Sequence, residues 1–321
     1  MNNPTRIAVL SPMALLLITC GNAAPPPNSP PTQPTVSTDE PALAASENEV
    51  DDAEDISPEA RKEAHALYNL ALEHKRAEQF NEALEALDEA IKIHPKFAAA
   101  HFTRGTVLKA LGRLDEAVEA FKEARTLKPT HQNAWAMEGA CFVRLKAYEK
   151  ALPPLEQAIE MSGKDAQSVM NLGIALKNLE RYDEAIKVYD RGLEDMPGDP
   201  GILNNLAMLL SKLKRYEEAI IYLQDALKAD PENIDLRLNL AIAFRQAERY
   251  DEAIPAYEKV IEKQPGNGGA LYDLGYCYER EKRPKDAIRV YKQYVKAVKN
   301  SDPEGAKRTD DLIKRMEKNR R

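Results

Sequence analysis

Residues 166–199 read AQSVMNLGIALKNLERYDEAIKVYDRGLEDMPGD, and this stretch predicts the structure of most of the chain. Its apolar residues recur at steps of three and four, the spacing of one helix face, in two separate runs. A polar turn over 179–182 divides the runs, and Asp183 and Glu184 open the second run, where carboxylates complement the helix dipole. A Pro-Gly pair at 197–198 ends it. The stretch therefore predicts two short helices that fold back on each other as a hairpin.

The same pattern returns every 34 residues along the chain. A fixed period of this length is typical of a solenoid of stacked helical hairpins. One column is alanine in all seven copies and another is always Gly or Ala, which allows the two helices of a hairpin to approach closely. The alanine column consists of Ala83, Ala117, Ala151, Ala185, Ala219, Ala253 and Ala287, and the small column of Ala71, Gly105, Gly139, Gly173, Ala207, Ala241 and Gly275.

The composition favours an all-helical protein without catalytic chemistry. Of the 321 residues, 43% are hydrophobic and 30% are charged, and the abundant Ala, Glu, Lys and Leu are strong helix formers. The five histidines form no H-E-x-x-H pair, and no Ser stands in a nucleophile-elbow context. Cys141 and Cys277 share one repeat position, which favours buried small hydrophobes over reactive thiols. We therefore expect no enzyme activity, no cofactor and no metal site.

The net charge of −7 is concentrated before the repeats. Residues 21–56 hold eight acidic residues and no basic one, whereas residues 57–321 contain equal numbers of acidic and basic residues. Nucleic-acid-binding domains usually carry a net positive charge. We therefore do not expect nucleic acid as a partner.

The first twenty residues indicate an export signal. Residues 1–6 end in one positive charge, and the mostly apolar residues 7–18 follow. This apolar segment is shorter than the roughly 20 residues that a permanent membrane helix needs. The sequence therefore predicts a signal peptide over residues 1–19.

The end of this segment resembles a bacterial lipoprotein signal. Leu17 and Cys20 stand at that family's positions, whereas Thr19 replaces the Gly, Ala or Ser that usually precedes the Cys. The resemblance implies that Cys20 becomes the first mature residue and carries lipid. It also implies a lipid-anchored protein of the bacterial cell envelope, on the outer membrane and facing the periplasm. An ordinary cleaved signal that contains a Cys is the alternative.

Residues 20–56 are predicted to form the lipidated Cys and a disordered tether. They contain seven prolines, the eight acidic residues and almost no large apolar side chain. Such a segment cannot bury enough surface to offset the entropy of ordering. We expect a spacer between the membrane and the repeats.

The spacing of the small, aromatic, Ala and Pro columns resembles the tetratricopeptide repeat (TPR) family, and Trp135 holds the family's characteristic Trp position. The resemblance implies an all-α protein, a right-handed α-solenoid of seven TPR helical hairpins over residues 57–301. Ser57 and Pro58 are expected at the start of the first helix. A capping helix and basic tail should occupy residues 302–321. The repeats are placed at 64–97, 98–131, 132–165, 166–199, 200–233, 234–267 and 268–301.

The third repeat departs most from the pattern. Pro153 and Pro154 fall inside its second helix, and Gly163 replaces the terminal proline. Proline beyond the first helical turn removes a hydrogen bond and clashes with the carbonyl four residues earlier. The sequence therefore predicts a locally distorted or looser hairpin.

Stacked hairpins form a groove lined by their first helices, and in TPR proteins this groove takes an extended peptide or a partner's helix. One groove column reads Asn69, Thr103, Met137, Asn171, Asn205, Asn239 and Asp273. Side-chain amides can hydrogen-bond a peptide backbone without reading its sequence. Some TPR superhelices use such a ladder, so Asn69, Asn171, Asn205 and Asn239 are candidate partner contacts. Alternatively, these side chains only bridge neighbouring repeats.

Basic residues recur near the end of each first helix, among them Lys177, Lys212, Arg245 and Arg280. One interpretation is that they complement the helix dipole. The other is a basic stripe that attracts an acidic partner. The carboxylate-clamp subtype of the family needs Lys where this chain has Tyr68 and Phe102, so we do not expect it.

Tyr272 and Tyr276 stand one helical turn apart on the predicted groove side of repeat seven. Exposed aromatic side chains often anchor partners. Filling of the core is the competing interpretation.

The resemblance implies a non-enzymatic, membrane-anchored scaffold that assembles an envelope machine. Lipoproteins of this build resemble assembly factors for type IV pili and their secretins, or components of gliding-motility complexes. The alternative is an adaptor that docks cell-wall hydrolases or synthases. An RNA-binding helical repeat is disfavoured by the export signal and the balanced repeat charge.

Overall fold

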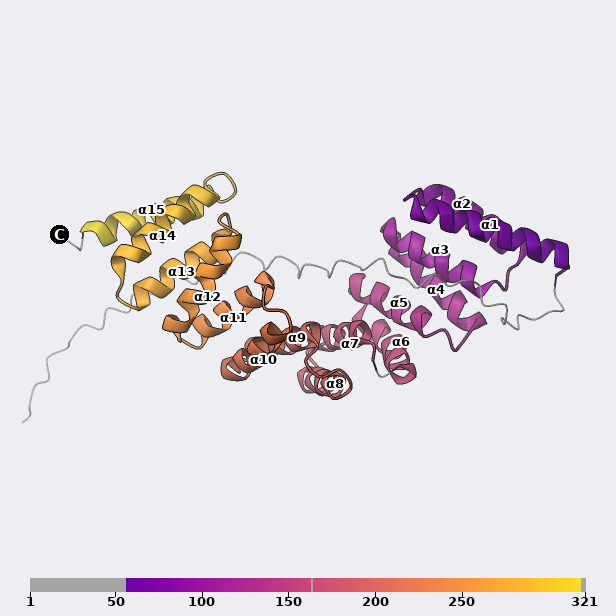
Figure 1. Cartoon of the computed structure of the whole chain (residues 1–321), viewed down its shortest axis with the longest axis horizontal. Helices are drawn as coiled ribbons and strands as arrows, with labels where there is room; N and C mark the ends of the chain where they lie inside the picture. The colour runs from indigo at the N-terminus through magenta and orange to yellow at the C-terminus, as the bar shows by residue number, and fades with distance from the viewer. Residues whose placement is uncertain (1–55, 163, 319–321) are drawn as a thin grey trace, which may run out of the picture. The chain divides into compact units, whose positions relative to one another are not determined.

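The structure is a computed structural model that describes residues 56–162 and 164–318. These residues form fifteen α-helices and no strand. Helices α1 to α14 pair into seven hairpins, and α15 follows the last one (Figure 1). The predicted fold class, an all-α solenoid of seven hairpins with a C-terminal capping helix, is confirmed. The pairs are α1 (Pro58–Arg76) with α2 (Phe80–Ile93), α3 (Ala98–Ala110) with α4 (Leu114–Leu127), α5 (Gln132–Arg144) with α6 (Tyr148–Met161), α7 (Ala166–Asn178) with α8 (Tyr182–Asp195), α9 (Pro200–Lys212) with α10 (Tyr216–Ala229), α11 (Ile234–Gln246) with α12 (Tyr250–Lys263), and α13 (Gly268–Arg280) with α14 (Pro284–Val298), and α15 spans Pro303–Lys318.

The start of α1 and the C-terminal helix α15 agree with the predictions, whereas the segment before Ile56 is not described. Ser57 caps α1 as expected, because its side chain accepts a hydrogen bond of 3.1 Å from the Ala60 amide, and Pro58 is the first helical residue. Helix α15 covers the last hairpin with the buried Ile313. The predicted signal peptide, Cys20 and the tether before Ile56 lie outside the described residues. No helix within the described ranges is long and apolar enough to span a membrane.

The turn inside each hairpin has the same geometry in all seven copies. In the fourth, the Arg181 amide donates to the Leu176 carbonyl at 2.9 Å and the Glu180 amide to the Lys177 carbonyl at 3.2 Å. This is a Schellman motif, which requires one residue in the left-handed region. Gly112 meets that requirement in the second repeat, but Glu180 has a φ of 61° and Lys214 one of 62°. The turn therefore keeps its form even where the sequence lacks glycine.

An arginine and an acidic residue fix the start of most second helices. Arg181 lies just before α8 and donates two hydrogen bonds of 2.7 Å to Glu184 in its first turn. The third repeat lacks this pair because Ala147 and Lys150 stand at the two positions. The same pair recurs as Arg113–Glu116, Arg215–Glu218, Arg249–Glu252 and Arg283–Asp286.

Small residues in the first helices make room for large ones in the second helices. A Cβ atom built on Gly173 would lie 2.1 Å from Cζ of Tyr189, and one on Gly105 would lie 2.6 Å from Cε1 of Phe121. Contacts this short do not occur, so glycine is required there unless the ring moves. Where the small column is glycine, it therefore lies against a large side chain of the second helix, which is Phe121, Leu155, Tyr189 or Tyr291.

The joints between hairpins use one position of the first helix, the seventh residue of each 34-residue copy. In repeats four to seven this position is Leu172, Leu206, Leu240 and Leu274, all at most 7% exposed. Leu70 holds it in the first of the described hairpins and is 42% exposed. In repeats two and three it is charged, as Arg104 and Glu138. The contact between hairpins is therefore apolar in repeats four to seven and contains a charged residue in repeats two and three.

The third hairpin has an unbroken second helix. Helix α6 runs from Tyr148 to Met161 although it contains Pro153 and Pro154, so the two prolines do not end it. The two carbonyls that lose their partners belong to Glu149 and Lys150, which are exposed and can bind water. The buried apolar side chains nevertheless form two clusters, residues 64–141 and 151–313, which divide within this hairpin. A lower local stability there stays a prediction.

Candidate protein-interaction surface

The first helices of repeats three to seven form a continuous row. Helix α7 contacts α5 and α9, and α11 contacts α9 and α13, in addition to the contacts within each hairpin (Figure 1). We call the side-chain surface of α1, α3, α5, α7, α9, α11 and α13 the first-helix face. Every predicted partner contact lies on these helices, apart from the lipidation site Cys20.

The asparagine column is engaged within the protein itself. Asn205 donates to the Gly201 carbonyl at 2.8 Å, and Asn171 is buried and accepts from Gln167 at 3.4 Å. Asn239 of α11 donates to Asn204 of α9 at 2.8 Å, which ties two repeats together. Asn69 is exposed on α1. The bridging interpretation thus has one direct example, and the role of the column as a peptide ladder stays a hypothesis.

The cations of repeats one to three lie close to one another, as do those of repeats four and five. Burial lowers the pKa of Lys109, and the nearby cations Arg144 and Lys75 lower it further, although Cys141 opposes them. Burial also lowers the pKa of Lys177, and the neighbouring Lys212 adds to the effect. Lys212 lies 5.0 Å above the ring of Tyr182. This stretch of the first-helix face therefore concentrates positive charge.

The cations of repeats six and seven have partners. Arg245 forms an ion pair of 3.2 Å with Asp273, and the Tyr257 hydroxyl donates to the same carboxylate at 3.0 Å. Burial raises the pKa of Asp273, whereas Arg245 and Tyr257 oppose that rise. Arg280 stacks over the rings of Tyr250 and Tyr276, 5.3 and 6.0 Å from their centres. Sequence reasoning missed the Arg245–Asp273 pair because its members lie 28 residues apart in different repeats.

The predicted aromatic pair has two different environments. Tyr272 is 41% exposed, and its ring lies 5.3 Å from Tyr294 and 5.6 Å from Tyr291. Tyr276 is half-buried against Tyr250, 6.0 Å between ring centres. Tyr272 therefore offers an accessible aromatic surface, while Tyr276 packs against Tyr250 of the preceding repeat.

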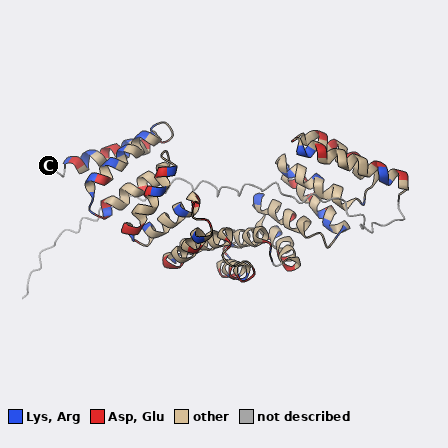
Figure 2. Cartoon of the chain, viewed as in Figure 1, with Lys and Arg blue, Asp and Glu red and all other residues tan. Residues whose placement is uncertain are grey.

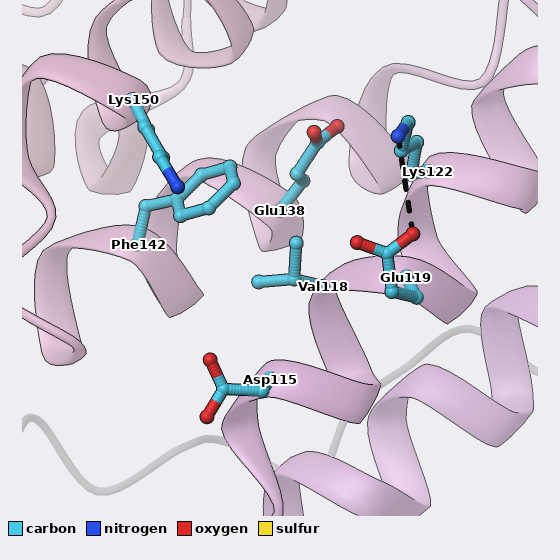
Figure 3. Close-up of a pocket in the computed structure, with 7 residues that line it drawn as sticks. All are labelled: Asp115, Val118, Glu119, Lys122, Glu138, Phe142 and Lys150. Atoms are coloured by element: carbon cyan, nitrogen blue, oxygen red, sulfur yellow. Dashed lines mark ion pairs between the residues drawn. The ribbon is translucent and has the colours of Figure 1, made fainter.

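A separate cavity of about 400 Å³ lies among α4, α5 and α6 (Figure 3). Glu138, at the position that is leucine in later repeats, turns toward Arg125 and forms two hydrogen bonds with it, one of them 3.2 Å long. Arg125 also stacks 4.2 Å from the ring centre of Trp135. Val118 and Phe142 line the cavity together with Glu138.

Charged residues of both signs occur on most helices, whereas α3, α7 and α9 carry basic residues and no acidic one (Figure 2). Across residues 56–162 and 164–318, no three His, Cys, Asp or Glu side chains are grouped to hold a metal ion. Burial raises the pKa of the Cys141 thiol, and it raises that of Cys277 to about 12, so both thiols are held in the neutral form. The structure thus presents surfaces rather than a cluster of reactive groups.

Comparison with known families decides the classification. The family profile described as "Tetratricopeptide repeat" matches residues 68–131, 102–168 and 238–302, and a second profile of the same description matches 165–232 and 200–266. The chain belongs to the tetratricopeptide repeat family. TPR domains are protein-interaction scaffolds, so protein partners follow for this chain. The search of curated proteins finds no match.

Solved structures support the fold. The TPR chain is 22% identical to "MamA 41-end from Desulfovibrio magneticus RS-1", with a TM-score of 0.50 over 53% of this chain and 96% of that one. It is also 22% identical to the "MamA RS-1 ArsTM double mutant", with a TM-score of 0.50 over 53% of this chain and 95% of that one. "YrrB: a TPR protein with an unusual peptide-binding site" matches at 22% identity and a TM-score of 0.47, over 59% and 97% of the two chains.

Proposed function

We propose that this TPR protein is a non-enzymatic scaffold of the bacterial cell envelope, anchored by lipid at Cys20. It binds segments of partner proteins on the first-helix face and so assembles an envelope machine, of the type IV pilus and secretin kind or of the gliding-motility kind. The observation that carries the binding part is the row of cations on this face. The anchoring part rests on the sequence around Leu17 and Cys20.

Electrostatics favours an acidic partner on this face. Lys109, Arg144, Lys177 and Lys212 form no ion pair among the described residues, whereas exposed cations on the second helices commonly do, as Lys228 does with Asp225 at 2.7 Å. Like charges held together without counter-charges repel one another, and an acidic partner relieves that repulsion. Tyr272 adds an aromatic contact at the far end of the row.

The test is site-specific photo-crosslinking in living cells from Asn205 on α9, with Gln224 on α10 as the exposed control on a second helix. We expect capture of secretin, pilus or motility subunits from Asn205 only. Capture of cell-wall hydrolases or synthases instead would support the adaptor alternative. Equal products from both positions would contradict binding on the first-helix face.

A separate test addresses the anchor. Cys20→Ser should release the protein from the membrane fraction, because the lipid attaches to the cysteine sulfur. A Cys20→Ser variant that stays fully membrane-bound would contradict lipid anchoring while leaving the binding surface untouched.

A further inference from the structure

The second helix of the seventh repeat differs in charge from the other second helices. Each of α2, α4, α6, α8, α10 and α12 contains two or three more acidic than basic residues. Helix α14 contains four basic residues and one acidic residue. The second helices are therefore net acidic in six repeats and net basic in the last.

The four basic residues of α14 form one exposed stripe. They follow one another at steps of four, three and four residues, which places them on one face of the helix over about 16 Å. Arg289 pairs with Asp286 at 3.2 Å. Lys292 pairs with Glu317 of α15 at 2.9 Å. The other two form no ion pair within residues 56–162 and 164–318. The basic stripe consists of Lys285, Arg289, Lys292 and Lys296.

The same positions of α6 carry negative charge. Three of the four are glutamates, each 136 residues, or four repeats, before its counterpart in the basic stripe. All four side chains are exposed, and the three carboxylates form no ion pair in the described part of the chain. Lys150, the one basic residue of α6, lines the cavity of Figure 3 instead. The acidic stripe consists of Glu149, Pro153, Glu156 and Glu160.

One arginine of the next repeat lies near the acidic stripe. Arg181 donates two hydrogen bonds of 2.7 Å to Glu184, and these bonds raise the pKa of the guanidinium. The more distant charges of Glu149 and Glu156 add to that rise. Because Glu184 engages the guanidinium directly, the carboxylates of α6 stay accessible to a cation of another molecule.

No other described second helix offers an equivalent counterpart. At the four stripe positions, α2, α4, α8 and α10 each include a basic residue. Helix α12 has three acidic residues there, but Glu258 accepts a hydrogen bond from Tyr278. Glu262 of the same helix lines a pocket together with Lys259 and Lys263. The acidic stripe of α6 is therefore the best match for the basic stripe.

We propose that copies of this protein associate through their second helices, with the basic stripe of α14 in one copy lying against the acidic stripe of α6 in another. The two stripes have the same length because they occupy equivalent helix positions. Exposed ion pairs are individually weak, so the contact depends on several pairs together and weakens as salt rises. It goes beyond the proposed function, since it leaves the first-helix face free for other proteins.

Sedimentation velocity of the purified full chain in detergent tests the proposal over a range of protein concentrations. We expect association that grows with concentration in about 0.05 M salt, and an affinity about ten-fold lower in about 0.5 M salt, because salt screens exposed charges. A single one-chain species at every concentration in the lower salt would overturn the inference.

Two charge-reversed variants locate the contact. Lys285→Glu with Lys296→Glu should abolish self-association, and so should Glu156→Lys with Glu160→Lys, because like charges then meet. A mixture of the two double variants, carrying different fluorescent labels, should associate again. The mixture pairs the unaltered α14 of one variant with the unaltered α6 of the other. Failure of the mixture to associate would overturn the inference.

Lys92→Glu with Lys228→Glu is the matched control. Both lysines are exposed on second helices at the repeat position of Lys296, and the double change alters the net charge by the same amount. This control should associate like the parent protein. An equal loss in the control would show that net charge alone governs association, which would overturn the proposed contact.

A milder variant protects the test against a loss of fold. Lys285→Gln with Lys296→Gln should weaken association about five-fold while leaving thermal unfolding by circular dichroism unchanged. An unchanged affinity in this variant would contradict the contact. Binding of the basic stripe to phosphatidylglycerol vesicles without any self-association would also overturn the inference, and would identify an anionic lipid surface as its partner.

The sedimentation and crosslinking experiments fail independently. Capture of a partner from Asn205 without self-association would refute this inference and leave the proposed function standing. Self-association without any captured partner in cells would support the contact between α14 and α6 and contradict the proposed function.

Discussion

Repeats two and three differ from repeats four to seven in the residue that precedes the first helix and in the contact with the preceding hairpin. The first helices of the later repeats are capped by Asp165, Asp199, Asn233 and Asn267, whose side chains each accept a backbone N–H. In the earlier repeats Phe97 and His131 hold this position and make no such bond. They instead stack on aromatic rings, as Phe102 does on His131 at 4.5 Å.

The joints show the same difference. Leucines close the joints of repeats four to seven, whereas Arg104 pairs with Asp88 at 2.6 Å and Glu138 pairs with Arg125 in the earlier ones. A partly exposed ion pair such as Arg104–Asp88 contributes little to stability, and the desolvation of the buried Glu138 offsets much of its attraction to Arg125, whereas burial of a leucine contributes about 2 kcal/mol. The same 34-residue repeat therefore accepts either a buried leucine or an ion pair at the contact between hairpins. Because the ion pairs contribute less, we expect the N-terminal repeats to unfold first.

The largest expected effect is at a leucine joint. Leu206→Ala should lower the free energy of unfolding by about 3 kcal/mol, because it leaves a cavity where the side chain is 1% exposed. Leu70→Ala is the matched control at the same repeat position, 42% exposed, and should change it by less than about 0.5 kcal/mol. Urea denaturation measures both. Similar losses from the two variants would contradict the account of the joints.

Converting an early joint to the later kind should stabilise the protein. Glu138→Leu restores the leucine of repeats four to seven, fills the space beside Val118 and Phe142, and leaves Arg125 partly exposed to water. We expect a gain of about 1 kcal/mol, since hydrophobic replacement of a buried ion pair is often stabilising. Glu138→Ala should destabilise instead, because it removes the partner without filling the space. A loss of stability from Glu138→Leu would show that the ion pair holds the joint.

The caps should contribute less than the joints. Asp199→Ala removes the bond of 2.9 Å to the Ile202 amide and should cost about 1 kcal/mol. His131→Asp introduces the same cap before α5, and hydrogen exchange should then show slower exchange in the first turn of that helix. Unchanged exchange there would mean that stacking on Phe102 already orders the turn.

The smallest expected effect concerns the third repeat. Ala147→Arg combined with Lys150→Glu installs the pair that opens most other second helices, and should stabilise α6 by about 0.5 kcal/mol. Hydrogen exchange in the parent protein should show α6 less protected than α8 and α10. Equal protection of the three helices would contradict a weaker third hairpin.

Much of the fold could be predicted because its signals are local. The helix faces, the cap at Ser57 and the small-residue columns follow from spacings within one repeat. The pairs of arginine and acidic residue at the second helices could also be read from the sequence, since Arg and Glu stand three residues apart in four copies and Arg283 and Asp286 do so in a fifth. The continuity of α6 through Pro153 and Pro154 could not be predicted, because the general rule against internal proline does not consider whether the freed carbonyls face water.

The sequence by itself determined the period, the hairpins and the balanced charge of the repeats, because these depend on residues that are neighbours along one helix or one turn. Only the tertiary structure decided which residues of the first-helix face already contact other side chains of the protein. Asn239 meets Asn204, and Arg245 meets Asp273, across stacked hairpins. Stacking brings residues about 28 to 35 positions apart into contact, and burial then makes their charges and hydrogen bonds depend on each other.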